Sequence, residues 1–343
     1  MEQRTLTVTS YSGLANRLRV LTSAVVMAGE TGRALTMHWH RLPTCGAAFD
    51  ELFTNDLPVV NFADAPITPL PDFAGPLGRD LFDLLTATEP HIAIKAVTWL
   101  ALPEIYPHHR PLLARCAAVL DELRPTPEIE ERVAAFRSAH FRPRMIGVHL
   151  RRGDFYRYSA YSVDNTTSAV AATRRYLQAC PDAGIFLCTD DGAADPVTGR
   201  RTVEGTHEKF RRAFGDRVIR AEPRSLDRAD SAAVQDALVD LLLLRACDFV
   251  VGTWGSSFSE LAVFGRDVPA VMCRSGGMWG WIDRAGTATG FWNWLNRQVS
   301  RHTGGRAGGI HLIRHMRPRA IAARLLQTYA PALFERVRSK KKF

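Results

Sequence analysis

The sequence lacks the features of a membrane protein. No stretch of its 343 residues approaches the roughly 18 uninterrupted apolar residues that a membrane helix needs. The N-terminus leads from Met1 directly into a strand-like pattern, without the apolar core of a signal peptide. We therefore expect a cytoplasmic protein, or a trimmed one, with no stable membrane insertion.

Cysteine is scarce, and the six cysteines lie far apart without a Cys-x-x-Cys pair. Most stand in apolar surroundings, which predicts buried reduced thiols and not disulfides or zinc ligands. The histidine pairs of the chain lack the glutamate that accompanies them in a zinc motif. The sequence thus predicts neither a metal ion nor another cofactor.

Several nucleotide-binding and hydrolase motifs are also missing. The sequence has no Walker loop and no Gly-x-Gly-x-x-Gly motif with its downstream acid, which argues against ATPases and dehydrogenases. The Gly-x-Ser-x-Gly elbow of the α/β-hydrolases is absent as well.

Positive charge exceeds negative charge, with 44 Lys+Arg against 35 Asp+Glu and a net charge of +9. Such a surplus attracts nucleotides, phosphosugars and nucleic acid alike, so charge alone selects none of them. A polyanion-binding protein is therefore one alternative function, but the sequence has no recognised nucleic-acid motif, and we expect no nucleic-acid partner. The terminal cluster at 339–343 is interpreted as a solvated tail.

The pattern of strands and helices predicts two α/β domains. An alternating strand at 5–9, a helical run at 14–30 and a strand at 34–39 form a β-turn-α-β unit. A second series of alternating strands and helices begins at Met145 and describes a doubly wound parallel sheet. The prolines at 125 and 127 interrupt the chain between the two series. We place a first, N-terminal domain at 1–140, a second domain at 141–315, and a helix with a basic tail at 316–343.

Two arginines follow the strand expected at 145–150. In an open α/β sheet, ligands bind beyond the carboxyl ends of the strands. Arg151 and Arg152 there offer two guanidinium groups side by side, which suits a diphosphate. A salt bridge between domains is the alternative interpretation. His149 either faces the ligand or is a core residue, and Asp154 either orients an arginine or caps a turn.

Other strand ends offer weaker signals of anion binding. Ser256 and Ser257 follow a glycine between a strand and a helix, which fits a phosphate site or an ordinary helix cap. Gly13 and Asn16 repeat this pattern in the first domain. Asp240 lies one helical turn after Asp236, at the edge of a buried surface, where it could reach a ribose or a base; a solvated helix face is the alternative.

Taken together, four stretches resemble the fucosyltransferase superfamily that includes rhizobial NodZ, the α1,6-, plant and α1,2-fucosyltransferases, and the protein O-fucosyltransferases. The stretches occur in the family's order, span most of the chain and are these: Gly13-Leu14-Ala15-Asn16-Arg17-Leu18-Arg19, Gly147-Val148-His149-Leu150-Arg151-Arg152-Gly153-Asp154, Phe186-Leu187-Cys188-Thr189-Asp190-Asp191, and Asp240 to Ala262.

The resemblance implies a GT-B fold, with two facing Rossmann-like domains and a cleft between them. It further implies an inverting, metal-independent transferase that uses GDP-fucose as donor and a carbohydrate as acceptor. By motif position, Arg151 would grip the β-phosphate and Arg152 would act nearby or through structure. The remaining expected contacts to the donor come from His149 and Asp240 at the guanosine, Ser256 and Ser257 at the phosphates, and Gly13 and Asn16 from the first domain.

The chain departs from the family pattern at the expected catalytic base. The α1,6-enzymes have an acidic residue a few positions beyond the arginine motif, but the stretch 155–160 here has no carboxylate. Asp154 and Asp164 are the nearest candidates. A catalytically silent GDP-sugar-binding protein and a transferase of another nucleotide sugar are therefore the alternative functions. The sequence predicts neither the acceptor nor the oligomeric state.

Overall fold

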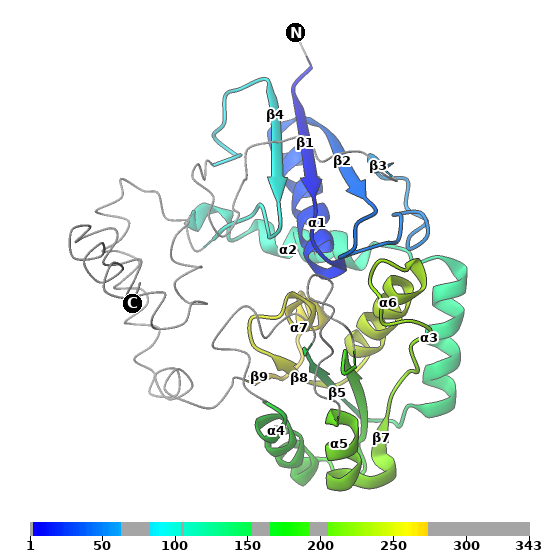
Figure 1. The fold of residues 1–343 in the computed structure, drawn as a ribbon. Helices are drawn as coiled ribbons and strands as arrows, with labels where there is room; N and C mark the ends of the chain where they lie inside the picture. Colours follow the sequence, from blue (N-terminus) through cyan, green and yellow to red (C-terminus); the bar gives the residue numbers. More distant parts are fainter. Residues whose placement is uncertain (1–2, 63–82, 104–105, 153–164, 193–204, 274–343) are drawn as a thin grey trace, which may run out of the picture.

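The computed structural model describes residues 3–62, 83–103, 106–152, 165–192 and 205–273, and it has two lobes, each built on a parallel sheet (Figure 1). The first sheet has the order β3-β2-β1-β4, and the second has the order β7-β6-β5-β8-β9. Within each sheet the first strand in the chain lies between the second and the fourth. Both sheets therefore have the same order around their first strand, and the second is the doubly wound sheet that the sequence predicts.

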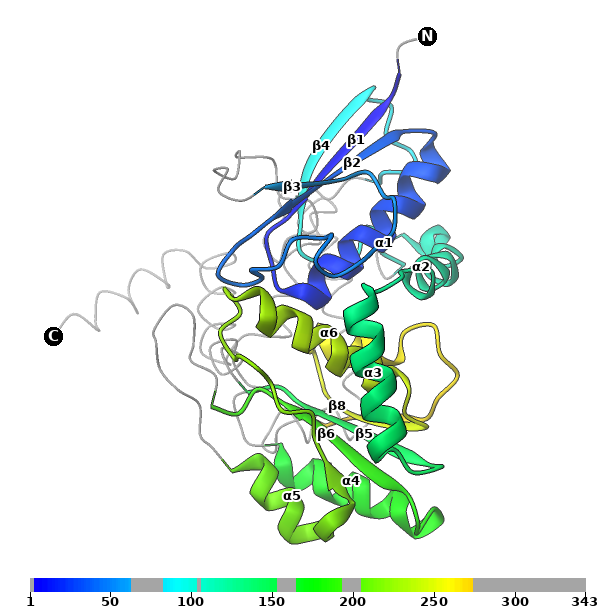
Figure 2. The same ribbon diagram turned by 90° about the vertical axis from the view of Figure 1, so that its right-hand side faces the viewer.

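The first sheet contains β1 (Thr5–Ser10), β2 (Ala34–His40), β3 (Val59–Phe62) and β4 (His91–Ala96). Helix α1 (Leu14–Thr31) follows β1 and ends at Gly32, whose left-handed backbone (φ 59°) lets its N–H group cap the helix. A 3-10 turn (Pro107–His109) precedes α2 (Leu112–Asp121). Helices α1 and α2 both lie on one face of this sheet (Figure 2).

Alternation along the strands explains which face the helices cover. Leu6 and Val8 of β1 and Met37 of β2 are fully buried in the core beneath α1. The residues between them, such as Thr7 and Thr9, point to the opposite face because successive side chains of a strand alternate. That opposite face is polar along β1, which is unusual for a parallel sheet.

The second sheet contains β5 (Met145–Leu150), β6 (Gly184–Thr189), β7 (Val218–Ile219), β8 (Phe249–Thr253) and β9 (Ala270–Cys273). All six residues of the central strand β5 are buried. Helices α4 (Thr166–Ala179) and α5 (Thr206–Phe214), the latter followed by a 3-10 turn (Gly215–Arg217), cover one face. Helices α3 (Pro127–His140), α6 (Ser231–Arg245) and α7 (Ser257–Val263) lie on the other face, toward the first lobe (Figure 2).

The two lobes share one hydrophobic core. A single buried cluster runs from β1 and α1 of the first lobe to Leu243 and Leu244 of α6 and Leu261 of α7. A separate cluster fills the space between the second sheet and helices α4 and α5. Across the lobe interface Arg19 of α1 pairs with Glu260 of α7. The lobes are therefore joined by apolar packing as well as by polar contacts.

Loops beyond the carboxyl ends of both sheets also meet. The N–H group of Gly46, after β2, donates to the carbonyl of Arg228, before α6, at 2.7 Å. A Cβ atom at Gly46 would collide with the carbonyl of Ala229, so only glycine fits this approach. Ser231 donates to Glu51 at 3.0 Å nearby. These contacts bring the ligand-binding edges of the two sheets together.

Most sequence-based expectations for these elements are confirmed. The parallel α/β architecture is present, and all six cysteines are free, with five of them buried. The expected helix near 317–329 lies outside the described residues. The boundary at residue 140 stays a prediction, and the helix that precedes it, α3, packs against α6 of the second lobe. None of the helices in the described ranges is long and apolar enough to cross a membrane.

Candidate active site

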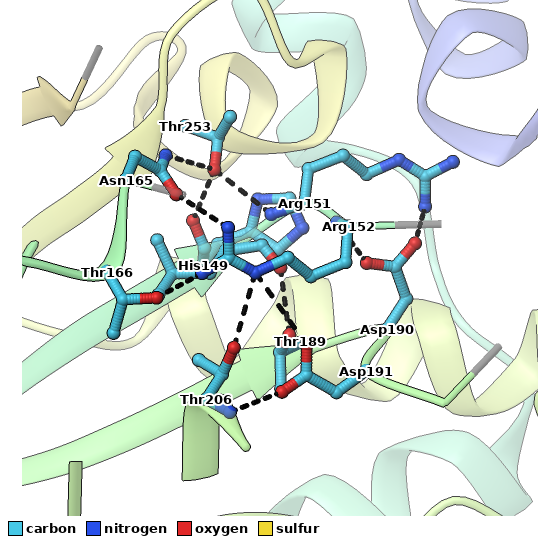
Figure 3. Close-up of polar contacts among 11 residues, drawn as sticks. His149, Arg151, Arg152, Asn165, Thr166, Thr189, Asp190, Asp191, Thr206 and Thr253 are labelled. Atoms are coloured by element: carbon cyan, nitrogen blue, oxygen red, sulfur yellow. Dashed lines mark hydrogen bonds and ion pairs between the residues drawn. The ribbon is translucent and has the colours of Figure 1, made fainter. Parts of the chain in front are cut away.

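The candidate site lies at the carboxyl ends of β5 and β8, which are neighbours in the second sheet. The chain leaves these two strands toward opposite sides of the sheet, which is where open α/β folds bind ligands. Thr253 at the end of β8 joins the strand ends: its Oγ1 donates to the carbonyl of His149 at 3.1 Å and accepts from the N–H of Arg151 at 3.0 Å (Figure 3). The backbone direction at Arg151 is thereby fixed.

Arg151 and Arg152 extend their side chains in opposite directions from this point (Figure 3). The alternation of a β-strand continues beyond Leu150, so consecutive residues point to different faces. Arg151 Nη1 donates to Asp190 Oδ2, and about one fifth of the Arg151 side chain is exposed. The pair of guanidinium groups expected to bind one diphosphate is thus divided between two environments.

Arg152 anchors the starts of two helices. Its Nη1 donates to Asn165 Oδ1 at 3.1 Å and its Nη2 to Thr166, both at the start of α4, while its Nε donates to Thr206 at the start of α5 at 3.2 Å. Asp191 completes this cluster, because its Oδ2 accepts from the N–H of Thr206 at 2.7 Å. These contacts fit the expectation that Arg152 acts through structure.

Asp190 is the residue that organises Arg151. Its Oδ2 accepts from Arg151, its Oδ1 accepts from the N–H of Arg152 at 2.5 Å, and Arg228 Nη2 lies 3.7 Å from Oδ2. No role was predicted for Asp190 from the sequence. Its position directly after β6, the neighbour of β5, would have indicated a place in the same site. Arg228, in the loop before α6, gave no signal in the sequence because it follows no strand directly.

His149 is a buried, neutral side chain that faces α7. Its Nδ1 lies 2.6 Å from Ser259 Oγ, and its ring centroid lies 4.7 Å from that of Phe258. Burial lowers the pKa of His149 to about 3; the negative charge of Asp190 opposes this shift, and the positive charge of Arg151 adds a smaller lowering effect. The structure therefore joins this residue to the helix that follows β8.

Asp240 lies on the same face of the sheet as His149. Its Oδ2 accepts from the thiol of Cys188 at 3.3 Å, and Cys188 is the register partner of His149 on the neighbouring strand. Burial raises the pKa of the Asp240 carboxyl to about 7, with a smaller contribution from the charge of Asp236. Asp240 therefore changes its charge near neutral pH.

Asp236, one turn earlier on α6, is bound by two arginines. Its Oδ1 accepts from Arg132 Nη2 at 2.5 Å and from Arg224 Nε at 2.9 Å, while its Oδ2 accepts from the N–H of Arg224 at 2.6 Å. Arg224 belongs to the loop that carries Arg228. Asp236 thus holds this loop against α6 and α3. Its contacts are those of a structural residue and not of a ligand-binding one.

The two loops expected at the phosphates lie at the lobe-facing ends of their strands. Ser256 is buried at the start of α7, directly after Gly255, whose φ of 76° favours glycine, and Ser257 is half-buried. In the first lobe Gly13 begins α1, and Asn16 Nδ2 donates to Ser12 Oγ at 2.7 Å.

Arg17 supports the turn between β1 and α1. Its side chain is fully buried, its Nε donates to the carbonyl of Ser12 at 2.7 Å and its Nη1 to the carbonyl of His40 at 2.5 Å. The guanidinium carbon lies 5.1 Å from the ring centroid of Trp39. Burial lowers the pKa of Arg17. This residue ties the β1–α1 turn to the end of β2.

Several expected residues cannot be placed. Asp154 and the alternative base Asp164 lie outside the described residues, as does the stretch 155–160.

A second polar cluster, made of Asp83, His108 and His109, has the composition of a metal site. His109 Nδ1 accepts from the N–H of Leu102 at 3.1 Å, so the proton of the neutral ring sits on Nε2, which donates to Asp83 Oδ1 at 2.8 Å. His108 Nε2 lies 2.6 Å from Asp83 Oδ2. To bind a metal ion through Nε2, the neutral ring of His109 would have to carry its proton on Nδ1, where it would face the N–H of Leu102. Hydrogen bonding to one carboxylate thus accounts for this cluster.

Comparison with solved structures identifies the fold. NodZ, a fucosyltransferase from Bradyrhizobium, matches with a TM-score of 0.50 and 19% identity, over 79% of this chain and 96% of NodZ. A variant of Arabidopsis thaliana FUT1 in complex with GDP gives 0.56 and 15%, over 81% and 72%. POFUT1 in complex with GDP-fucose gives 0.51 and 13%, over 80% and 99%. No protein-family model and no curated protein matches the chain.

These likenesses confirm the α/β fold of the GT-B fucosyltransferases that the four motifs predict. At identities below 20% they establish the fold and not the reaction. The activity must therefore be argued from the site.

Proposed function

We propose that the chain is a glycosyltransferase that takes fucose from GDP-fucose and transfers it, with inversion and without a metal ion, to a glycan or a glycosylated small molecule. The observation that carries the proposal is the guanidinium of Arg151, which Asp190 holds at the point where the connections of the second sheet diverge. Structures of the same fold have been obtained with GDP or GDP-fucose, which supports this donor.

Arg151 supplies the charge that such a reaction needs. As the bond between the sugar and the β-phosphate breaks, negative charge develops on the departing diphosphate. A guanidinium fixed in place before the reaction stabilises that charge without a metal ion. Asp190 holds the Arg151 side chain, and Thr253 accepts a hydrogen bond from the Arg151 backbone N–H, so the residue is held in position from two sides. The acceptor hydroxyl then attacks the opposite side of the sugar carbon, which inverts its configuration.

Asp240 and His149 are proposed to bind the guanosine. An ionised carboxylate accepts from the two neighbouring N–H donors on the edge of a guanine, which neither adenine nor uracil presents. Asp240 has a pKa of about 7 and carries this charge above neutral pH. His149, neutral and held by Ser259, shapes the floor beside it.

The phosphate oxygens are proposed to lie between the two loops described above. Ser256 and Ser257 would approach from the second lobe and Gly13 and Asn16 from the first. Arg152 fixes the helices behind the site, and Asp154 is proposed to stand beside the reacting atoms at the end of the same motif.

A thermal-shift panel of GDP-, UDP- and ADP-sugars tests the donor. We expect GDP-fucose to stabilise the protein most, since ligands that bind only the folded state raise the melting temperature. Stabilisation by UDP-sugars alone would exclude the proposal. Release of GDP from GDP-fucose in the presence of acceptor candidates separates a transferase from a silent GDP-sugar-binding protein, which binds GDP and releases none.

Two arginines at opposite ends of β5 form a matched pair for testing the site. Arg151→Met should weaken GDP binding by about 10- to 100-fold, because a charge-assisted hydrogen bond contributes about 1.5–3 kcal/mol. Arg144 also pairs with an aspartate, Asp248, at 2.7 Å, but at the amino end of the strand. Arg144→Met should leave the affinity for GDP unchanged. Equal affinities for GDP in the two variants would remove the role assigned to Arg151.

A further inference from the structure

In the first sheet the strand order reverses at β1. Helix α1 leaves β1 and leads to β2 on one side, while β4 lies on the other. Because ligands of open α/β sheets bind beyond the carboxyl ends of the strands, the ends of β1 and β4 are a second edge to consider. The face of the sheet opposite α1 and α2 meets this edge (Figure 2).

A row of three polar residues crosses this face near the edge. Thr9 of β1 pairs in register with His38 of β2 and with Lys95 of β4, so the three side chains stand on the same face. Thr9 Oγ1 lies 3.2 Å from His38 Nδ1. Burial lowers the pKa of His38, which keeps its ring neutral at neutral pH. The row combines a hydroxyl, a neutral imidazole and one ammonium group.

The positive charge of this row comes from the ammonium group of Lys95. Its Nζ lies 4.2 Å from the ring centroid of Tyr11, directly after β1, and the side chain is half-buried. Among the described residues no carboxylate lies within ion-pair distance of it. An aromatic face compensates only part of the cost of removing an ammonium from water. A ligand oxygen with negative charge would complete its environment.

Lysine is also an exception in this chain. Lys95 is one of two lysines before the terminal run Lys340-Lys341-Lys342, whereas arginine supplies almost all other positive charge. A lysine ammonium is a compact point charge with three donors, while the arginine fork is planar and broad. A single anionic group above an aromatic ring fits the lysine better.

We propose that Lys95, Tyr11, Thr9 and His38 form an acceptor subsite that selects a carbohydrate bearing an anionic group, such as a carboxylate, sulfate or phosphate. The proposal rests on the glycosyltransferase function argued above. Thr9 is buried and holds Nδ1 of the His38 ring; the imidazole binds a sugar hydroxyl through its other nitrogen, and the ammonium binds the anionic group. Because this edge faces the second lobe, the bound acceptor is brought toward the donor.

An array of matched oligosaccharides, each present in neutral, uronate, sulfated and phosphorylated form, tests the subsite with GDP-saturated protein. We expect the wild-type protein to retain at least one acidic form about tenfold better than its neutral partner, and the arms of the array identify the anion. Lys95→Gln should reduce this ratio to about one, and Lys95→Arg should keep part of it. Lys209→Gln, the same change on α5 of the second lobe, should leave the ratio unchanged.

Calorimetry with GDP on the same preparations separates the two proposals. Wild-type protein that binds GDP but retains acidic and neutral glycans equally would overturn the acceptor subsite alone. Loss of GDP affinity in Lys95→Gln would also overturn it, because Lys95 would then belong to the donor site. Wild-type protein without affinity for GDP would instead refute the proposed function.

Discussion

Arg17 and Arg33 are two buried arginines of the first lobe. They lie at opposite ends of the strands of its sheet. Arg17 binds carbonyls at the carboxyl edge. Arg33 binds those of Pro90 at 3.1 Å and Ala87 at 3.0 Å at the amino edge. Replacing Arg17 by methionine leaves the carbonyls of Ser12 and His40 without these donors, at about 1–3 kcal/mol each. The carbonyls at Arg33 keep other donors, the N–H of Thr5 for Pro90 and the guanidinium of Arg4 for Ala87. Relief from burying a charge offsets part of this cost.

We expect Arg17→Met to lose about 2–4 kcal/mol of stability and Arg33→Met to lose less, and both losses lower the melting temperature. Only Arg17→Met should also weaken donor binding. The Arg17 side chain fixes the carbonyl of Ser12, and the turn that begins there carries Gly13 and Asn16 toward the proposed phosphates. A tenfold loss of affinity for GDP corresponds to about 1.4 kcal/mol.

Thermal melting without ligand and calorimetry with GDP measure the two effects separately. Arg33→Met sets the loss of affinity that destabilisation alone produces. The reasoning is refuted if the two variants lose affinity equally, because the turn would then play no part in binding. It is refuted equally by an Arg17→Met protein that is destabilised but binds GDP as tightly as the wild type.

Three further predictions follow from single contacts. Affinity for GDP should rise by up to about tenfold from pH 6 to pH 8, because the Asp240 carboxyl with its pKa of about 7 becomes an ionised acceptor over this interval; calorimetry of Asp240→Asn should show a flat profile. Gly46→Ala should cost about 1–3 kcal/mol in chemical denaturation through a collision across the lobe interface, whereas Gly29→Ala, whose Cβ meets no atom within 4 Å, should cost nothing. Asp190→Asn should lower the turnover of GDP-fucose by about tenfold by loosening Arg151, while Asp191→Asn should act on the melting temperature instead.

The sequence predicts the fold well because the periodic patterns that define it are local. The β-turn-α-β unit at the start and the series from Met145 onward appear as parallel strands with intervening helices. The strand order was not predictable from these patterns, since hydrogen bonding between strands depends on residues distant in sequence. The contact of α3 with α6 was unpredictable for the same reason. Two prolines mark where α3 begins, but they do not indicate which sheet it packs against.

Most candidate site residues could be named only because they follow strands directly; Asp240, named from its helical spacing after Asp236, is an exception. Arg151, Ser256 and Gly13 could be named because a strand end is visible in the sequence. Arg228 and Arg17 could not, because the first stands in a long loop and the second lies inside an amphipathic helix. Their importance comes from the backbone atoms that they meet, the N–H of Gly46 and the carbonyl of Ser12.

The pair Arg151-Arg152 illustrates how backbone geometry divides a motif into two tasks. Two adjacent guanidinium groups repel each other, and the sequence alone leaves a diphosphate and a salt bridge between the domains as alternatives. The structure separates the charges, because alternation sends Arg152 to the starts of α4 and α5 and Arg151 to Asp190. A diphosphate would then meet one guanidinium, held in place by Asp190, and not two. The rigid attachment of Arg152 thus makes the neighbouring charge available to a ligand.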